Sequence, residues 1–156
     1  MKTINSYCFL LTAISLLAIL LSTCGDIVPD SPPYIITTPV CELSSSNLYD
    51  FTYAGISFKF MNNSQKIIDS ITACFMLFDS KTQSNPFAGS NVFEITKLVL
   101  VSPGENSEIV LSLDSFIHIA PAEPYLIDFF YISKIHYTDG NTWEDRYGIY
   151  SVRVLK

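Results

Sequence analysis

Residues 51–61 read FTYAGISFKFM, and the apolar side chains at positions 56, 58 and 60 alternate with Ser57 and Lys59. Successive side chains of a β-strand point to opposite faces, so this alternation predicts a strand with one buried face and one face in contact with water. Residues 62–65, NNSQ, are typical of a turn, because Asn tolerates left-handed backbone geometry and bonds to its own backbone. The segment therefore predicts a β-strand that ends at a turn.

Further apolar segments of strand length follow, and turn residues separate them. They span residues 67–78, 92–101, 108–113, 125–137 and 143–154, with Asp139-Gly140 as a hairpin signal and a bulge expected at Gly148. The predicted buried faces comprise Ile67, Ile71, Ala73, Phe75 and Leu77 in one strand, and Tyr125, Ile127, Phe129, Tyr131, Ile135 and Tyr137 in another. No sustained helical period of apolar residues follows residue 24, so the sequence predicts an all-β sandwich of two sheets.

One of these strands carries a recognisable signature. Phe75-Met76-Leu77-Phe78-Asp79 resembles the Phe-x-Leu-Tyr-Asp signature of the FxLYD immunoglobulin-like domains of bacterial lipoproteins, with Phe in place of Tyr. The turns at residues 62–64 and at Ser102-Pro103-Gly104 resemble turns of the same family, so the resemblance covers roughly residues 51–113. The resemblance implies an immunoglobulin-like sandwich on an envelope lipoprotein and no enzymatic activity, and the turn-separated segments predict about seven antiparallel strands in it.

Residues 1–23 have the organisation of a secretory signal. Lys2 is their one charged residue, and residues 8–21 form an uncharged run of 14 residues, shorter than the roughly 20 that a membrane-spanning helix needs. Leu21-Ser22-Thr23-Cys24 resembles the lipobox of bacterial lipoproteins, which implies that Cys24 is lipidated after cleavage. The alternatives are an ordinary secreted protein, in which Cys24 has no such role, and an uncleaved helical anchor.

The predicted domain organisation is a signal peptide at residues 1–23, the lipidated Cys24 with a Pro-rich tether at residues 24–48, and the sandwich at residues 49–156. Four prolines between residues 25 and 40 exclude a helix there and favour an extended backbone. The alternative for part of this segment is a first edge strand at Tyr34-Ile35-Ile36, because Pro is tolerated beside edge strands.

The charge balance limits the classes of partner. The chain has 9 basic and 15 acidic residues, and loss of Lys2 with the signal leaves a net charge of −7. The remaining basic residues are scattered singly, whereas binding to nucleic acid or to an anionic lipid surface needs clusters of them. We therefore expect no nucleic acid partner. The expected partners are the membrane, through the N-terminal lipid, and an envelope protein.

Motifs for catalysis or cofactor binding are not found. The sequence lacks a Gly-rich phosphate loop, a G-x-S-x-G elbow and an H-E-x-x-H motif, so we expect no catalytic residue, no cofactor and no metal. Cys41 and Cys74 lack the spacing of a metal or redox motif, and they either pair as a disulfide or remain two buried thiols. We interpret the remaining polar candidates as surface, packing and turn residues rather than metal ligands: His118, His136, Asp139, Asn141, Glu144 and Asp145.

An apolar surface remains as the candidate site. Phe130 and Ile132 fall on the face opposite the predicted core, and Trp143 and Tyr150 are expected to join them in a partner surface. The alternative is that the N-terminal segment covers this face. The sequence therefore predicts a lipid-anchored, non-enzymatic binding or assembly module of the bacterial envelope, on the periplasmic face or the cell surface. An accessory subunit of an envelope complex and, less favoured, a small hydrolase are the alternative functions.

Overall fold

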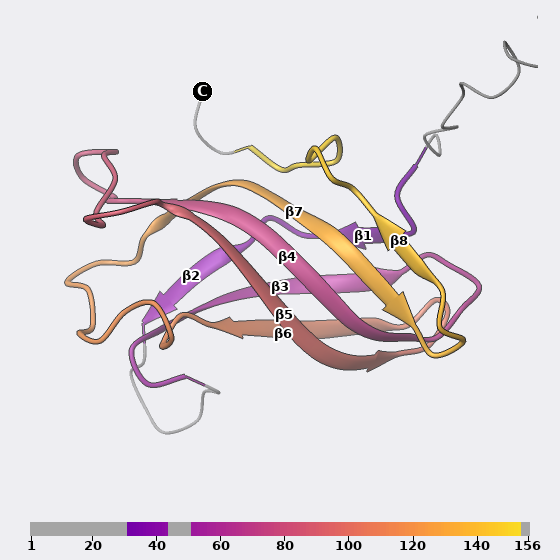
Figure 1. Ribbon diagram of the computed structural model, residues 1–156. Coiled ribbons are helices and arrows are strands. Elements are labelled where there is room, and N and C mark those ends of the chain that lie inside the picture. The colour runs from indigo at the N-terminus through magenta and orange to yellow at the C-terminus, as the bar shows by residue number, and fades with distance from the viewer. Residues whose placement is uncertain (1–30, 44–50, 154–156) are drawn as a thin grey trace, which may run out of the picture. The chain divides into compact units, whose positions relative to one another are not determined.

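The computed structural model describes residues 31–43 and 51–153, and every regular element in these ranges is a β-strand (Figure 1). The strands are β1 (Tyr34–Ile36), β2 (Val40–Leu43), β3 (Ala54–Asn62), β4 (Ile68–Phe78), β5 (Val92–Val101), β6 (Asn106–Ser112), β7 (Leu126–Tyr137) and β8 (Thr142–Glu144). The predicted all-β class is confirmed, and so is the turn at residues 62–65. The described residues contain eight strands where the sequence predicted about seven.

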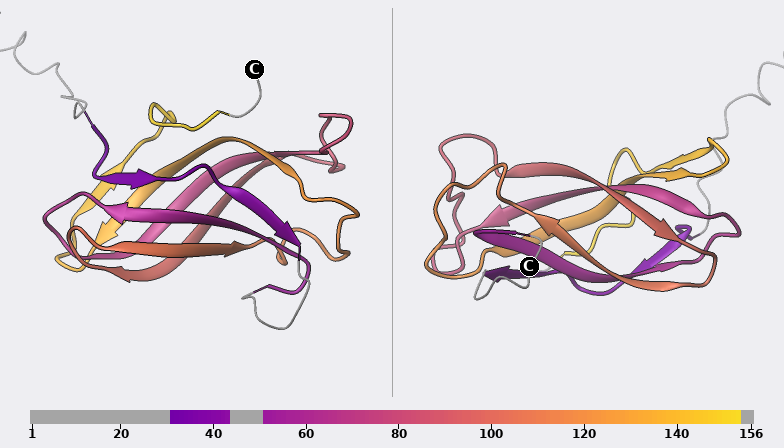
Figure 2. Two further views of the ribbon diagram at one scale, coloured as in Figure 1. Left: turned by 180° about the vertical axis from the view of Figure 1, so that it is seen from behind. Right: turned by 90° about the horizontal axis from the view of Figure 1, so that it is seen from below.

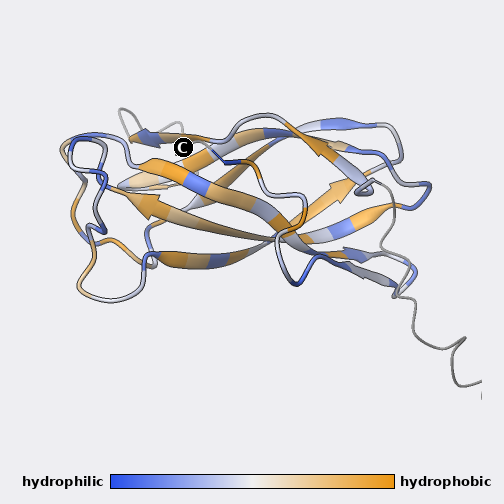
Figure 3. Cartoon of the chain, turned by 90° about the horizontal axis from the view of Figure 1, so that it is seen from above, coloured by the Kyte–Doolittle hydropathy of each residue, from blue (hydrophilic) through white to orange (hydrophobic). Residues whose placement is uncertain are grey.

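The strands form two antiparallel sheets. In sheet A, β1, β2 and β6 all pair with β3, while sheet B has the order β5-β4-β7-β8. Figure 2 shows the two layers from behind and from below, and confirms the predicted two-sheet, immunoglobulin-like sandwich. Figure 3 shows that the strands are mostly hydrophobic with single hydrophilic positions among them, as the alternation predicts.

Aromatic rings fill much of the space between the sheets. Phe130 of sheet B packs edge-on against Phe58 of sheet A, with ring centroids 5.0 Å apart, and stacks on Phe75 of its own sheet at 5.9 Å. The largest fully buried side chains are Phe60, Phe75, Phe130, Ile56, Ile68, Ile71, Leu77, Leu111, Leu113, Ile132, Ile135 and Val101. Burial of each such side chain contributes roughly 1.5–3 kcal/mol, so this interior is the main source of stability.

β7 departs from simple alternation at two places. Its pairing with β4 shifts once between the partners of Thr72 and Ala73 and again between those of Cys74 and Met76. Each shift inserts one extra residue into β7, and an extra residue exchanges the two faces of the strand beyond it. As a result Phe130 and Ile132 are fully buried, although Ile127, Ile135 and Tyr137, which also face the core, have odd numbers.

The prediction that Phe129 and Tyr131 belong to the core face was therefore wrong. Phe129 lies at the second shift with a φ of 51°, a left-handed backbone conformation that aromatic residues rarely adopt. A smaller error of the same kind affects the start of β4. Ile67, just before the strand, is exposed and Ile68 is fully buried, because the register shifts between Ile68 and Ser70.

The sandwich begins earlier than the sequence predicted. β1 and β2 lie within residues 24–48, the predicted tether, and both pair with β3. The alternative of an edge strand at Tyr34-Ile35-Ile36 is thus confirmed. The Tyr34 ring is buried, stacks on Phe60 at 5.8 Å and accepts a hydrogen bond from the Ile132 backbone N–H at its hydroxyl, so β1 is packed against both sheets.

The C-terminal strand is shorter than predicted. β8 ends at Glu144, and the next residues form a loop organised by the buried carboxylate of Asp145, which accepts hydrogen bonds from the backbone N–H groups of Tyr147, Ile149 and Tyr150. Gly148 lies in this loop with a φ of 65°, and a Cβ there would come within 2.8 Å of the Phe129 ring. The chain then returns to β7 through a bridge between Phe130 and Val152. The C-terminal segment therefore packs against the outer side of β7.

Candidate interaction surfaces

β5 forms one edge of sheet B and is ten residues long. It pairs with β4 alone among the described strands, so its other side presents backbone N–H and C=O groups without a strand partner in residues 31–43 and 51–153. A long edge of this kind is a template for pairing with another extended chain. The β5 edge, defined as residues 92–101, is therefore the first candidate interaction surface.

Two aliphatic side chains lie on the outer face of the β5 edge. Leu98 is 81% exposed and Leu100 is 73% exposed. Glu94 and Thr96 share this face, because alternate residues of the strand point the same way. Water-exposed leucines on consecutive outward positions are unfavourable in an isolated monomer and are typical of a contact surface.

The Lys97 side chain lies on the opposite face of the same strand. It pairs with Ile71, a fully buried core residue, and directly opposed residues of an antiparallel pair share a face, so Lys97 lies on the core-facing side at the rim of the sandwich. An inward-pointing charge on an edge strand disfavours edge-to-edge pairing of identical chains. The β5 edge is thus better suited to a different protein than to a second copy of this chain.

The sequence analysis did not single out Leu98 and Leu100. Residues 98–101 are LVLV, and an uninterrupted apolar run hides which side chains face outward. The polar residues Glu94 and Thr96 could have indicated that Leu98 and Leu100 are exposed, because they place the even-numbered positions of this strand on the solvent face.

The predicted partner surface is corrected by the structure. Phe130 and Ile132 are fully buried between the sheets and are not available to a partner. Trp143 and Tyr150 are half-buried, and the Trp143 ring lies 5.6 Å from Tyr34 in an edge-on contact and 6.1 Å from Tyr150. These two rings belong to a cluster that joins β1, β8 and the loop after β8, so the four residues do not form one surface.

Cys41 and Cys74 are free thiols, so the disulfide alternative is not supported. Cys41 pairs with Ile56 on the buried face of sheet A, whereas Cys74 lies between the core residues Ala73 and Phe75 and therefore points to the outer face of sheet B. The body of sheet B separates the two sulfur atoms. Burial raises the pKa of Cys41 above its ordinary value, so this thiol stays neutral. The predicted lipidation site, Cys24, lies outside the described residues.

The polar candidates from the sequence are placed in separate contacts. Nδ1 of His136 lies 2.8 Å from a carboxylate oxygen of Asp69 across β7 and β4, while His118 is exposed in the loop after β6. Glu144 pairs with Lys134 and Arg146. Within residues 31–43 and 51–153, no three His, Cys, Asp or Glu side chains are grouped as they would be to hold a metal ion.

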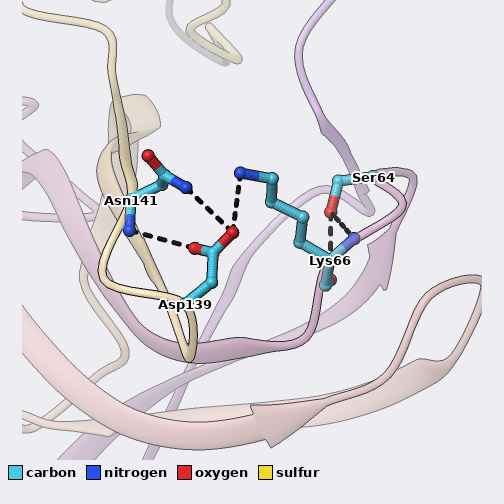
Figure 4. A network of polar contacts seen from close by, with 4 residues as sticks. All are labelled: Ser64, Lys66, Asp139 and Asn141. Carbon is cyan, nitrogen blue, oxygen red and sulfur yellow. Dashed lines mark hydrogen bonds and ion pairs between the residues drawn. The ribbon is translucent and has the colours of Figure 1, made fainter.

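Asp139 joins two neighbouring turns at one end of the sandwich. Figure 4 shows its carboxylate facing Lys66, with Nζ 2.8 Å away, and Asn141, which donates from its backbone and its side chain at 3.0 and 2.8 Å. The backbone N–H of Thr138 also donates to the Ile67 carbonyl across the same gap. The hydrogen bonds from Lys66 and Asn141 lower the pKa of Asp139 to about 2. These contacts join the two turns within the fold.

We expect replacement of Asp139 by Asn to flatten the pH dependence of unfolding between about pH 4 and pH 2. A carboxyl whose pKa is about 2 in the folded chain and about 3.9 when unfolded stabilises the fold above the higher value, and this contribution is lost as the pH falls through the lower one. Urea midpoints measured across this range test the expectation. Lys66→Gln serves as the partner control and should flatten the same window, whereas midpoints that run parallel to those of the unaltered protein would contradict the assignment.

Comparison with known proteins supports the fold and gives no information on function. No family model and no curated protein matches the sequence. Among solved structures, the chain is similar to a 1.85 Å X-ray structure of a hypothetical protein from Peptoclostridium difficile 630. The TM-score is 0.54 at 10% identity, and the similarity covers 76% of this chain and 89% of that chain. This likeness supports the sandwich architecture. Separately, the described residues contain no helix that is long and apolar enough to span a membrane.

Proposed function

We propose that this protein is a lipid-anchored lipoprotein of the bacterial envelope, with an FxLYD-type domain that acts as a non-enzymatic binding module. The partner is an extended segment of another envelope protein, which pairs with the β5 edge. The observation that carries this proposal is the row of exposed leucines, Leu98 and Leu100, on an edge strand without a strand partner among the described residues.

The physics of strand addition fits this edge. Backbone hydrogen bonds to the partner supply affinity that depends little on sequence, and alternate side chains supply specificity. Leu98 and Leu100 would contact every second residue of the added strand, and burial of each contributes roughly 1.5–3 kcal/mol. Lys97, on the core-facing side, disfavours pairing between two copies of the chain, so the proposal names a different protein as the partner.

The anchor has its own test. Cells fed a fatty-acid probe should label the protein, and Cys24→Ala should abolish the label, because the thiol of Cys24 is the proposed site of acylation. The mature N-terminal peptide should carry the corresponding mass. A protein that remains unlabelled, or one that is labelled equally after Cys24→Ala, would contradict the lipoprotein assignment.

The β5 edge is tested by site-specific crosslinking in the native envelope. A photo-reactive residue at position 98 should yield one reproducible crosslinked protein, and the same residue at position 119 should not. Ile119 is a matched control because its side chain is 83% exposed, compared with 81% for Leu98, but it lies in the loop after β6.

Substitution then measures the affinity. Leu98→Lys combined with Leu100→Lys should reduce recovery of the crosslinked partner by roughly tenfold or more, because a charge replaces each buried leucine and every 1.4 kcal/mol is a factor of ten. Ile119→Lys should leave recovery unchanged. Crosslinks that form equally at positions 98 and 119, or recovery that survives the double substitution, would contradict the proposed site.

A further inference from the structure

The loop between β8 and the end of the described chain exposes a second apolar surface. Tyr147 is 82% exposed and Ile149 is 57% exposed, and both side chains project from the loop held by Asp145. We call residues 145–151 the C-terminal loop. It lies at the β8 edge of sheet B, which is the edge opposite β5, so it is distinct from the surface proposed for the protein partner.

The exposure of these side chains is built into the loop. The Asp145 carboxylate fixes the backbone at Tyr147, Ile149 and Tyr150, and Gly148 packs against the rings of Phe129 and Tyr131. Gly148 packs against the protein, whereas its neighbours Tyr147 and Ile149 are exposed. The hydrogen bonds to Asp145 therefore hold a loop segment that presents an aromatic and an aliphatic side chain to solvent.

The residue types of this loop suit contact with a bilayer. Its one acid, Asp145, is buried and accepts hydrogen bonds from backbone N–H groups. The Arg146 side chain is 76% exposed and pairs with Glu144, so this pair carries no net charge. Tyrosine, which Tyr147 presents to solvent, is enriched at the water–headgroup interface of membrane proteins.

The start of β1 lies beside this loop. Trp143 contacts Tyr34 on one side and Tyr150 on the other, which links the start of β1 to the C-terminal loop. Figure 1 shows β1 next to β8. Nine residues lie between Cys24 and Tyr34, and covalent geometry limits the distance between these two residues to about 35 Å. A surface close to a short attachment meets the bilayer at high effective concentration.

We propose that the C-terminal loop is a membrane-contact loop, which places Tyr147 and Ile149 in the headgroup region of the bilayer that carries the lipid on Cys24. This inference rests on the proposed lipid anchor. It assigns opposite edges of sheet B to different tasks: the β8 edge contacts lipid, and the β5 edge remains available to a protein partner.

The test is photo-crosslinking of the unaltered, full mature protein in vesicles of phosphatidylethanolamine and phosphatidylglycerol that contain a diazirine-bearing phospholipid. Trypsin cleaves after Arg146 and Arg153, so the peptide 147–153 reports on the loop. It also cleaves after Lys97 and Lys134, so the peptide 98–134 reports on the end of β5, on β6 and the loop after it, and on most of β7. The second peptide is a matched control, because Leu98 and Ile119 in it are about as exposed as Tyr147.

We expect roughly tenfold more lipid adduct per mole of peptide 147–153 than of peptide 98–134, since the tether concentrates only nearby surfaces at the bilayer. Tyr147→Ser combined with Ile149→Ser should remove most of this excess. Equal adducts on both peptides, or adducts on 98–134 alone, would overturn the inference.

The state of Cys24 separates the two proposals. An acylated N-terminal peptide with no adduct on 147–153 leaves the anchor in place and rejects the membrane-contact loop. An N-terminal peptide without acyl chains rejects the anchor, and the loop inference fails with it.

Discussion

Replacement of Phe130 by Ala is expected to lower the free energy of unfolding by about 3–5 kcal/mol, the range for loss of a buried aromatic ring. The Phe130 ring is fully buried and contacts Phe58 of sheet A and Phe75 of sheet B, so it fills space between the two sheets. Alanine would leave a cavity that neither sheet can close without moving its strands. Urea unfolding followed by circular dichroism measures the loss.

The control for this variant is Leu98→Ala. Leu98 is 81% exposed, and substitutions at such positions usually change stability by about 0.5 kcal/mol or less. The comparison also decides between two assignments of β7. If Phe130 were on an outer partner surface, as alternation alone suggests, Phe130→Ala would behave like Leu98→Ala. Equal effects of the two variants would contradict the bulged register of β7.

Replacement of Asn62 by Ala is expected to lower the free energy of unfolding by about 2–4 kcal/mol, because it leaves several backbone groups without partners in a buried position. The Asn62 side chain is fully buried. Its Nδ2 donates to the carbonyls of Lys66 and Val101 at 2.8 and 2.9 Å, and its Oδ1 accepts from the backbone and hydroxyl of Ser64. One side chain thus joins the end of β3, the following turn and the end of β5.

Asn63→Ala is the matched control, because it makes the same change at the next residue, which is exposed. We expect it to change stability by about 0.5 kcal/mol or less. Asn62→Asp provides a second variant: its carboxylate oxygens would face two carbonyl oxygens, so it should destabilise at least as much as Ala. An Asn62→Ala protein as stable as Asn63→Ala would show that these hydrogen bonds contribute little.

Local patterns predicted most of the strands. Residues 92–101 were predicted to the residue, and the turn after β3 and the hairpin at Asp139-Gly140 lie where their residue types indicate. The predicted turn chemistry of Asn62 was correct in kind but incomplete. Its hydrogen bond to the Val101 carbonyl joins residues 39 apart in the sequence, and a pattern of neighbouring residues cannot predict such a contact.

The candidate site was predicted less well than the fold. Phe130 and Ile132 were assigned to a surface because two extra residues in β7 could not be read from its composition. Leu98 and Leu100 were overlooked because they lie in an apolar run, and the face that each side chain of this run occupies is set by pairing with the partner strand. In both cases the error concerns which face a residue occupies and not whether it lies in a strand.

The sequence by itself determined that this chain forms β-strands, where most of them begin and end, and which residues make its turns, because alternation and turn chemistry are properties of neighbouring residues. Only the tertiary structure decided which residues of β7 face the core, which strand remains an edge, and that the C-terminal loop packs outside β7. Those features depend on the register between strands that are distant in sequence. One inserted residue moves every later side chain of its strand to the opposite face of the sheet.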